Sequence, residues 1–163
     1  MNKVIKIYKK IISLNRKDRC ILAEAFILFR LYELIIIMVP FRVYKNLMGA
    51  YNAESPENIK FVNFDIINNI TWAVNAVDRF ALRKSKCLTK ALTAQKMLRK
   101  RSIDSTIYLG VKKDKFNKDK VEAHAWLRAG RFFITGGTNM NEFTKVAMFS
   151  TYCKDLPVGT TND

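Results

Sequence analysis

The stretch that decides the fold runs from residue 85 to residue 135 and holds four short patterns. They are SKCLTKALTAQKMLR (85–99), STIYLGVK (105–112), VEAHAWLR (121–128) and RFFIT (131–135). In the first, apolar residues recur at helical spacing behind a serine, a residue typical of helix N-caps. In the second and third, apolar residues alternate with others, which predicts strands. A helix followed by antiparallel hairpins predicts an α+β domain.

Further helices are predicted upstream of this stretch. They cover residues 2–13, 17–39, 41–48 and 61–82, with Pro40 ending the second and a polar loop, 52–58, preceding the fourth. The chain therefore divides into an N-terminal helical region (1–52), a core (53–150) and a C-terminal tail (151–163). We expect one compact domain, because 163 residues is close to the usual size of one.

The composition excludes several classes of protein. Hydrophobic residues make up 49% of the chain, and Gly and Pro number only 6 and 3, so it is not disordered, collagen-like or low in complexity. Three cysteines and one histidine are too few for a disulfide scaffold or a usual zinc site. These counts fit a reduced, cytoplasmic protein that holds no metal.

The chain is strongly basic. Its 29 Lys and Arg against 14 Asp and Glu give a net charge of +15, which favours an anionic partner. Residues 83–120 hold 13 of these cations and 3 of the acids. This run is either a solvated face or a ledge that attracts an anionic precursor or partner. It lacks the interleaved aromatic residues that stack on bases, so no nucleic acid partner is expected.

The most apolar segment, residues 21–41, does not have the pattern of a membrane span. Glu24, Arg30 and Glu33 lie within it, and its longest uncharged run, 34–41, is far shorter than the ~20 residues that a span requires. The segment predicts a buried helix of a soluble protein, with a helix lying at a membrane interface as the alternative, and membrane contact is not expected.

Cys87 and His124 are the candidates for chemistry. A cysteine near the start of a helix meets free backbone N–H groups and the positive end of the helix dipole. Lys84, Lys86 and Lys90 add positive charge nearby, and each effect favours the thiolate. His124 is the one histidine of the chain, and a Cys–His pair is the arrangement that a cysteine nucleophile needs. The alternative interpretations are a packed structural thiol and a hydrogen-bonded structural histidine.

The neighbours of His124 suit a site. Ala123 and Ala125 are small enough to let another element approach, and Trp126, on the same side of the strand as His124, can exclude water. Cys20 and Cys153 have no such surroundings, so we expect no chemistry from them.

Several of these segments, taken in order, resemble the transglutaminase-like cysteine peptidases of lasso-peptide biosynthesis. The resemblance is carried by CLTKAL (87–92), MLRKRSI (97–103), YLGV (108–111) and AHAW (123–126), with LAEA (22–25) and VPFR (39–42) upstream. Each motif is weak by itself, but their order and spacing are specific, and together they extend from about residue 15 to residue 150.

The resemblance implies a papain-like core in which a catalytic helix packs on a small antiparallel sheet. It implies a peptidase that removes the leader from a ribosomally made precursor, with Cys87 as nucleophile and His124 as general base, and with no cofactor. It further implies a stand-alone protease that acts with a separate leader-recognition protein, and an ATP-dependent cyclase that uses the freed amine.

The sequence departs from the family pattern at the third catalytic position. The family commonly has an Asp about a dozen residues beyond the His, but residues 134–139 read ITGGTN and contain no acid. We assign Asn139 to this position, because an amide can orient the imidazole ring. Glu122, Glu142 or a simple Cys–His dyad are the alternatives.

Two other functions stay open from the sequence. One is an acyl or amide transferase that uses the same thiol. The other is a non-catalytic basic protein that binds nucleic acid or an acidic peptide, whose binding would depend steeply on salt and not on Cys87.

Overall fold

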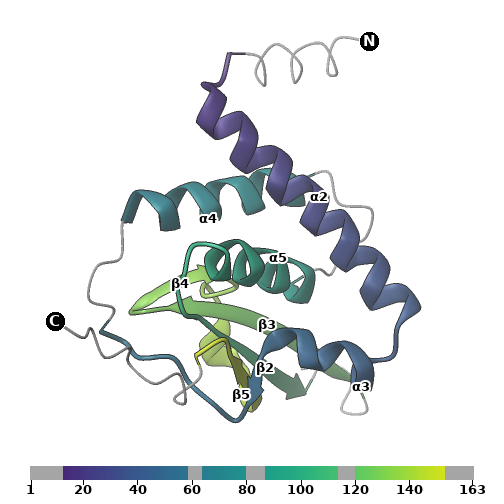
Figure 1. Ribbon diagram of the computed structural model, residues 1–163. Coiled ribbons are helices and arrows are strands. Elements are labelled where there is room, and N and C mark those ends of the chain that lie inside the picture. The colour runs from purple at the N-terminus through teal and green to yellow at the C-terminus, as the bar shows by residue number, and fades with distance from the viewer. Residues whose placement is uncertain (1–12, 59–63, 80–86, 114–119, 153–163) are drawn as a thin grey trace, which may run out of the picture.

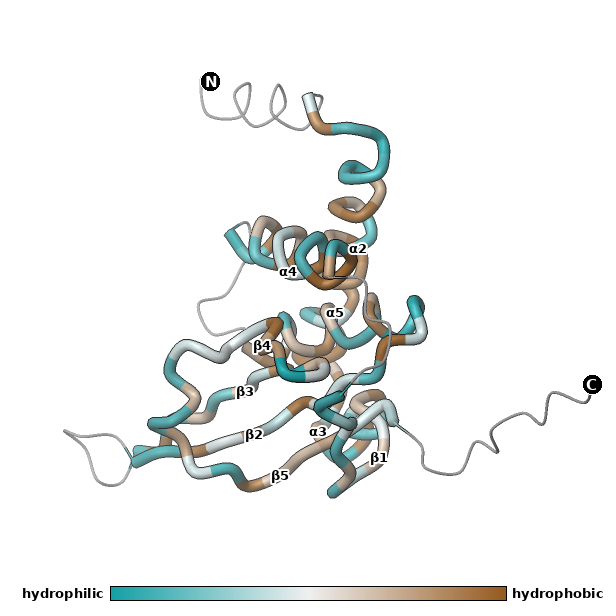
Figure 2. Tube along the Cα trace, turned by 90° about the vertical axis from the view of Figure 1, so that its left-hand side faces the viewer, coloured by the Kyte–Doolittle hydropathy of each residue, from teal (hydrophilic) through white to brown (hydrophobic). Residues whose placement is uncertain are grey.

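A computed structural model describes residues 13–58, 64–79, 87–113 and 120–152 of the chain. In chain order the elements are α2 (Arg16–Met38), α3 (Phe41–Tyr44), η1 (Lys45–Met48), β1 (Ala50–Tyr51), α4 (Phe64–Asp78), α5 (Cys87–Arg99), β2 (Thr106–Lys113), β3 (Val121–Ala129), β4 (Phe132–Thr135), η2 (Met140–Glu142) and β5 (Thr144–Ser150). They form three layers, in which α5 lies between the sheet and a layer made by α2 and α4 (Figures 1 and 2).

The α+β fold predicted from the sequence is confirmed. The helix expected over 17–39 is α2, the segment 41–48 forms α3 and η1, and α4 lies within the predicted 61–82, whose residues 61–63 and 80–82 are outside the described part of the chain. The helix predicted over 2–13 lies almost wholly outside the described residues.

The sheet has five antiparallel strands in the order β1-β5-β2-β3-β4. The β2–β3 pair is its longest regular hairpin and places Gly110 opposite His124 and Tyr108 opposite Trp126. Strands β1 and β5 were not predicted. Because β1 pairs with β5, the end of the predicted N-terminal region is part of the same sheet as the predicted core.

The core is built around α5, which is covered on both sides. Eight of its thirteen residues are buried, and its apolar side chains share one cluster with Ile107 and Leu127 of the sheet and with Phe29 and Ile70 of the outer helices. The buried polar groups of α5 are satisfied. Thr93 donates to the carbonyl of Thr89, and the amide of Gln95 donates to the carbonyl of Met48.

Helix α2 is buried on one side only, so the prediction of a fully buried helix is wrong. Only five of its 23 residues are buried. Large apolar side chains on its other side, and on α3 and η1, are 44–77% exposed: Phe26, Ile27, Leu31, Leu34, Ile37, Met38, Phe41, Val43 and Leu47. Apolar residues at helical spacing predict a helix but do not tell whether each of its faces is buried or exposed. The helix was therefore predicted correctly and the burial of its outer side was not. No helix in the described part of the chain is long and apolar enough to cross a membrane.

Candidate functional site

Cys87 is the first residue of α5, and its side chain is half-buried. The backbone N–H groups of the first helical turn have no partner within the helix, so this end carries partial positive charge. Lys90, one turn later, forms an ion pair of 3.2 Å with Asp78 at the end of α4. The predicted capping serine and the two lysines at 84 and 86 lie outside the described residues.

His124 lies on β3, and its half-buried ring is fixed by one hydrogen bond. The ring Nε2 lies 2.8 Å from the backbone carbonyl oxygen of Gly136, the residue that follows β4. A carbonyl oxygen only accepts, so Nε2 must carry the proton. The neutral ring is therefore the Nε2–H tautomer, and Nδ1 is left as its basic nitrogen.

Aromatic rings enclose His124 on two sides. Trp126 is stacked against it with centroids 5.9 Å apart, and Phe143 lies 4.9 Å away at a tilt. Tyr108 also stacks against Trp126, with centroids 5.7 Å apart. Trp126 thus lies where the sequence led us to expect it, whereas Phe143 was missed because it comes from a segment without a motif.

Gly110 makes room for this packing. A Cβ added at Gly110 would lie 2.7 and 2.8 Å from two ring carbons of Trp126 and 3.0 Å from the Cβ of Phe143. The glycine opposite His124 is therefore part of the site's construction, although a glycine within a strand gives no chemical signal in the sequence.

Cys87 and His124 belong to one helix–sheet unit, but the structure does not join them by a hydrogen bond within its described residues. Helix α5 packs against β3 and β4 on the face that carries Leu127 and Ala129, while alternation along β3 puts His124 on the other face. The bond to Gly136 holds the ring at the sheet margin beyond the last residue of β4.

Within the described residues, no hydrogen bond joins the Asn139 side chain to the ring. Its side chain is exposed just before η2, its backbone carbonyl accepts from the N–H of Glu142, and the ring Nε2 is already bound by Gly136. The two alternative acids, Glu122 and Glu142, both bind the ammonium of Lys112, at 3.1 and 2.9 Å. The orienting partner that the structure gives to the ring is a backbone group instead of any of these side chains.

A polar network supports the strand face on which His124 lies. The buried Arg128 donates through Nε to the Tyr108 hydroxyl at 2.8 Å and through Nη2 to Glu54 at 3.0 Å and to the Ser55 carbonyl at 2.8 Å. Tyr108 donates to Glu54. Burial and this hydrogen bond to Glu54 raise the pKa of Tyr108 to about 12, so it stays a donor at neutral pH. The network holds the loop after β1 against the sheet.

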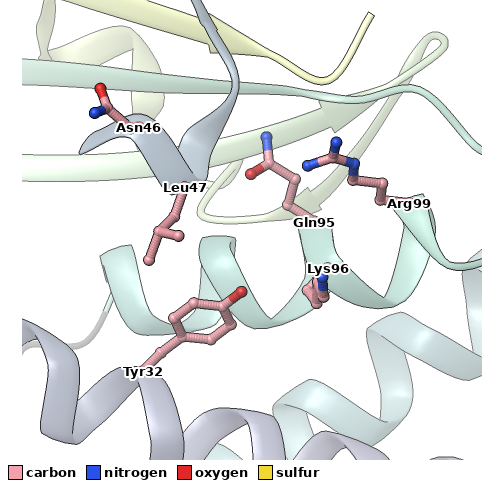
Figure 3. A pocket seen from close by; sticks show the side chains of 6 residues that line it. All are labelled: Tyr32, Asn46, Leu47, Gln95, Lys96 and Arg99. Atoms are coloured by element: carbon pink, nitrogen blue, oxygen red, sulfur yellow. The ribbon is translucent and has the colours of Figure 1, made fainter. Parts of the chain in front are cut away.

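The structure contains a small pocket elsewhere, of about 120 Å³, between α2, η1 and the second half of α5 (Figure 3). It is lined by Tyr32, Asn46, Leu47, Gln95, Lys96 and Arg99. These α5 residues are two to three turns beyond Cys87, so the pocket is separate from the candidate site. Among the described residues, no group of three or more His, Cys, Asp or Glu side chains is placed to hold a metal ion.

Comparison with known families agrees with this architecture. A helix headed by cysteine and packed on an antiparallel sheet that carries a histidine defines a papain-like or transglutaminase-like class of protein. The family model of the transglutaminase-like superfamily matches residues 38–148, more than half of the chain and a range that includes Cys87 and His124. The chain belongs to the transglutaminase-like superfamily. No curated protein and no solved structure matches it significantly.

Proposed function

We propose that this protein is a cysteine peptidase that removes the leader peptide from a ribosomally synthesised lasso-peptide precursor. The observation that carries the proposal is the state of the ring: the one histidine of the chain has Nε2 bound to a carbonyl and Nδ1 left as a base. The helix packed on its strand begins with a cysteine. The order of motifs described above supports the lasso-peptide substrate.

The proposed reaction requires Cys87, at the start of α5, and the ring of His124, at the sheet margin, to come together around the bound peptide, because the structure does not join them by a hydrogen bond among its described residues. The Cys87 thiol proton then passes to Nδ1 of His124. The thiolate attacks the carbonyl carbon of the scissile bond, and the resulting oxyanion accepts a hydrogen bond from the backbone N–H of Cys87 at the helix end. The imidazolium then gives its proton to the leaving nitrogen. The peptide bond breaks, the core peptide leaves with a free α-amine, and the leader stays on Cys87 as a thioester.

Water completes the cycle. His124 takes a proton from the attacking water, the thioester breaks, and the leader is released as a carboxylate while the thiol is restored. Neither step requires a metal or an organic cofactor. The freed α-amine is the group that an ATP-dependent cyclase would join to a side-chain carboxylate of the core peptide.

The partners we propose are the precursor, a separate leader-recognition protein and the cyclase, all acting in the cytoplasm. A recognition protein that binds both the leader and the protease would raise the effective concentration of the scissile bond, with gains of roughly 10²–10⁴ from tethering alone.

The test is mass spectrometry of a precursor incubated with the protein, with and without a recognition protein. Wild type and Cys20→Ala should release the core peptide with a new N-terminal amine, and Cys87→Ala should release none. Cys20 is the matched control because it is an exposed thiol outside the site. Cleavage by Cys87→Ala would overturn the mechanism. Acylation of an added amine in place of hydrolysis would make the protein a transferase.

A further inference from the structure

We propose that the backbone carbonyl of Gly136 is the orienting group of the catalytic histidine, in place of the Asp side chain that related peptidases use. This inference rests on the proposed function and adds a positioning residue to it. Gly136 lies twelve residues beyond His124, the distance at which the family pattern has its acid, and its carbonyl is 2.8 Å from Nε2.

The geometry explains why this position is a glycine. Its φ is +71°, in the left-handed region that favours glycine, and a Cβ there would lie 2.5 Å from the carbonyl oxygen of Ala125 and 3.1 Å from Nε2 of His124. A side chain of any kind, including that of Asp, would push against the ring or the strand. A carbonyl reaches the ring only because no side chain stands between them.

The chemical consequence is a fixed tautomer. A carboxylate and a carbonyl both accept a hydrogen bond from Nε2–H and leave Nδ1 basic. A carbonyl is neutral, so it stabilises the imidazolium less than a carboxylate does. A carbonyl in place of a carboxylate therefore keeps the orientation of the ring, but it stabilises the positive charge of the imidazolium less.

The experiment uses the single histidine of the chain, which makes its ¹⁵N signals unambiguous. The tautomer of the neutral His124 ring is measured by NMR in Cys87→Ala, which has no thiol to share the proton. The same measurement is made with Gly136→Ala and with Gly130→Ala added. Gly130 is the matched control because it has φ +56° in the same β3–β4 hairpin, so alanine strains the backbone there in a similar way.

We expect a pure Nε2–H tautomer in Cys87→Ala and in the Gly130 variant, and a mixture in the Gly136 variant. In the chain with Cys87 intact, Gly136→Ala should lower kcat about tenfold to hundredfold, scaled down from the 10⁴-fold loss in a serine protease held in the wrong tautomer. An Nδ1–H ring, or an unchanged tautomer in Gly136→Ala, would overturn the inference. A pure Nε2–H ring without any peptidase activity would instead refute the proposed function alone.

A second and independent inference concerns the outer apolar face, which we define as the nine exposed side chains of α2, α3 and η1 given above. We propose that this face binds the surface of an anionic membrane, with the helices lying in the plane of the interface. Apolar side chains flanked by Arg and Lys are the features by which helices bind such surfaces.

The charges around the outer apolar face complement an anionic surface. Arg16 and Arg19 are exposed and precede Leu34 and Ile37 by 18 residues, about five helical turns, so they lie on the same side of α2. Arg42 and Lys45 continue the cationic flank on α3 and η1, where both are exposed.

The acidic side chains of this region do not oppose that binding. Asp18 lies 200° around the helix from Arg16, on the opposite side. Glu24 is bound by Lys100 and Arg101 of the core, and Glu33 is buried against Arg30. The charges that argue against a membrane span therefore do not argue against a helix lying on the surface. The net charge of +15 also opposes pairing of this face with a second copy of the chain.

The test compares Leu34→Glu with Val146→Glu in sedimentation with vesicles of phosphatidylcholine, with and without phosphatidylglycerol. The two side chains are 56% and 55% exposed, and Val146 lies on β5, away from the face. Wild type and Val146→Glu should bind only the anionic vesicles, and Leu34→Glu should bind them roughly tenfold less or weaker still. Absence of wild-type binding, equal loss in both variants, or a dimer in solution that Leu34→Glu dissociates would overturn the inference.

Discussion

Replacement of Gly110 by alanine is expected to disturb the candidate site more than the fold. The new Cβ would meet the ring of Trp126 at 2.7–2.8 Å, and real Cβ atoms essentially never approach so closely. Trp126 is only 6% exposed and stacks with both Tyr108 and His124, so its ring cannot swing out to solvent. The displacement must pass to the rings beside it, and one of these is His124, the proposed catalytic base.

The size of the effect follows from the packing. Overpacking of a well-filled site costs about 1–3 kcal/mol in the free energy of unfolding, and for a domain of this size each kcal/mol lowers Tm by about 2–4 °C. A misplacement of about 1 Å in a catalytic group can cost 10²-fold in rate. We therefore expect kcat/KM to fall about tenfold to hundredfold.

The assay pairs urea unfolding with leader cleavage, and Trp126 fluorescence is read in a Trp72→Phe background, since the chain has two tryptophans. Ala129→Val is the control. Ala129 lies on β3, the strand that carries His124 and Trp126, but it is fully buried on the opposite face, against α5. This variant should lose similar stability and keep its kcat/KM. If Gly110→Ala lost no more activity than Ala129→Val, the coupling of ring packing to catalysis would be refuted.

Three further predictions follow from contacts of single side chains. Asn139→Ala and Glu142→Ala should change kcat/KM for leader cleavage by less than about tenfold, because the Gly136 carbonyl holds the ring. If either variant were inactive, the replaced residue would be the orienting group instead. Arg128→Met should lower the free energy of unfolding by about 2–3 kcal/mol in urea titration, because Glu54 and the buried Ser55 carbonyl lose the guanidinium that donates to them. Burial raises the pKa of Glu24, but hydrogen bonds from Arg101 and Lys100 outweigh it and lower that pKa below the ordinary 4.5. The stability that Glu24 adds is therefore present above pH 4.5 and is lost as pH falls through its lowered pKa, so the deficit of Glu24→Gln, about 1–2 kcal/mol at neutral pH, should vanish in acid.

Periodicity made most of the fold predictable. Apolar residues recur at helical spacing in the α5 segment and alternate with other residues in β2 and β3. The helix and the hairpin both form where this spacing predicts them. Strand β5 reads TKVAMFS, in which four apolar residues follow one another without alternation. Strand β1 has two residues, too few for any pattern. Both take their conformation from tertiary pairing, which a local pattern does not contain.

The sequence points to candidate site residues only where a side chain implies chemistry. Cys87, His124 and Trp126 are such candidates, because a thiol, an imidazole and an indole each imply a chemical role, and the structure places Trp126 against the ring of His124. Gly136 acts through a backbone carbonyl, which every residue has, so no residue type signals it. Asn139 is the nearby residue whose side chain implies that role, and the structure gives it no hydrogen bond to the ring among the described residues. The weak signal that was available is the Gly-Gly pair after a strand, which indicates close backbone approach.

The two sides of α2 have different surroundings: the inner side contacts the core, and the outer side is exposed. Its inner side is tied to the core, where Glu24 binds Lys100 and Arg101 just beyond α5. The family match begins at residue 38, so nearly all of α2 lies outside the region that defines the superfamily. In the described part of the chain, the neighbours of the His124 ring are Trp126, Phe143 and Gly136, none of which belongs to the outer apolar face. Because changes at sites without common partners add, Leu34→Glu should leave the tautomer of His124 unchanged, and Gly136→Ala should leave vesicle binding unchanged. Any coupling between the two would mean that surface binding reaches the site through α5, which, among the described elements, contacts both α2 and β3 closely.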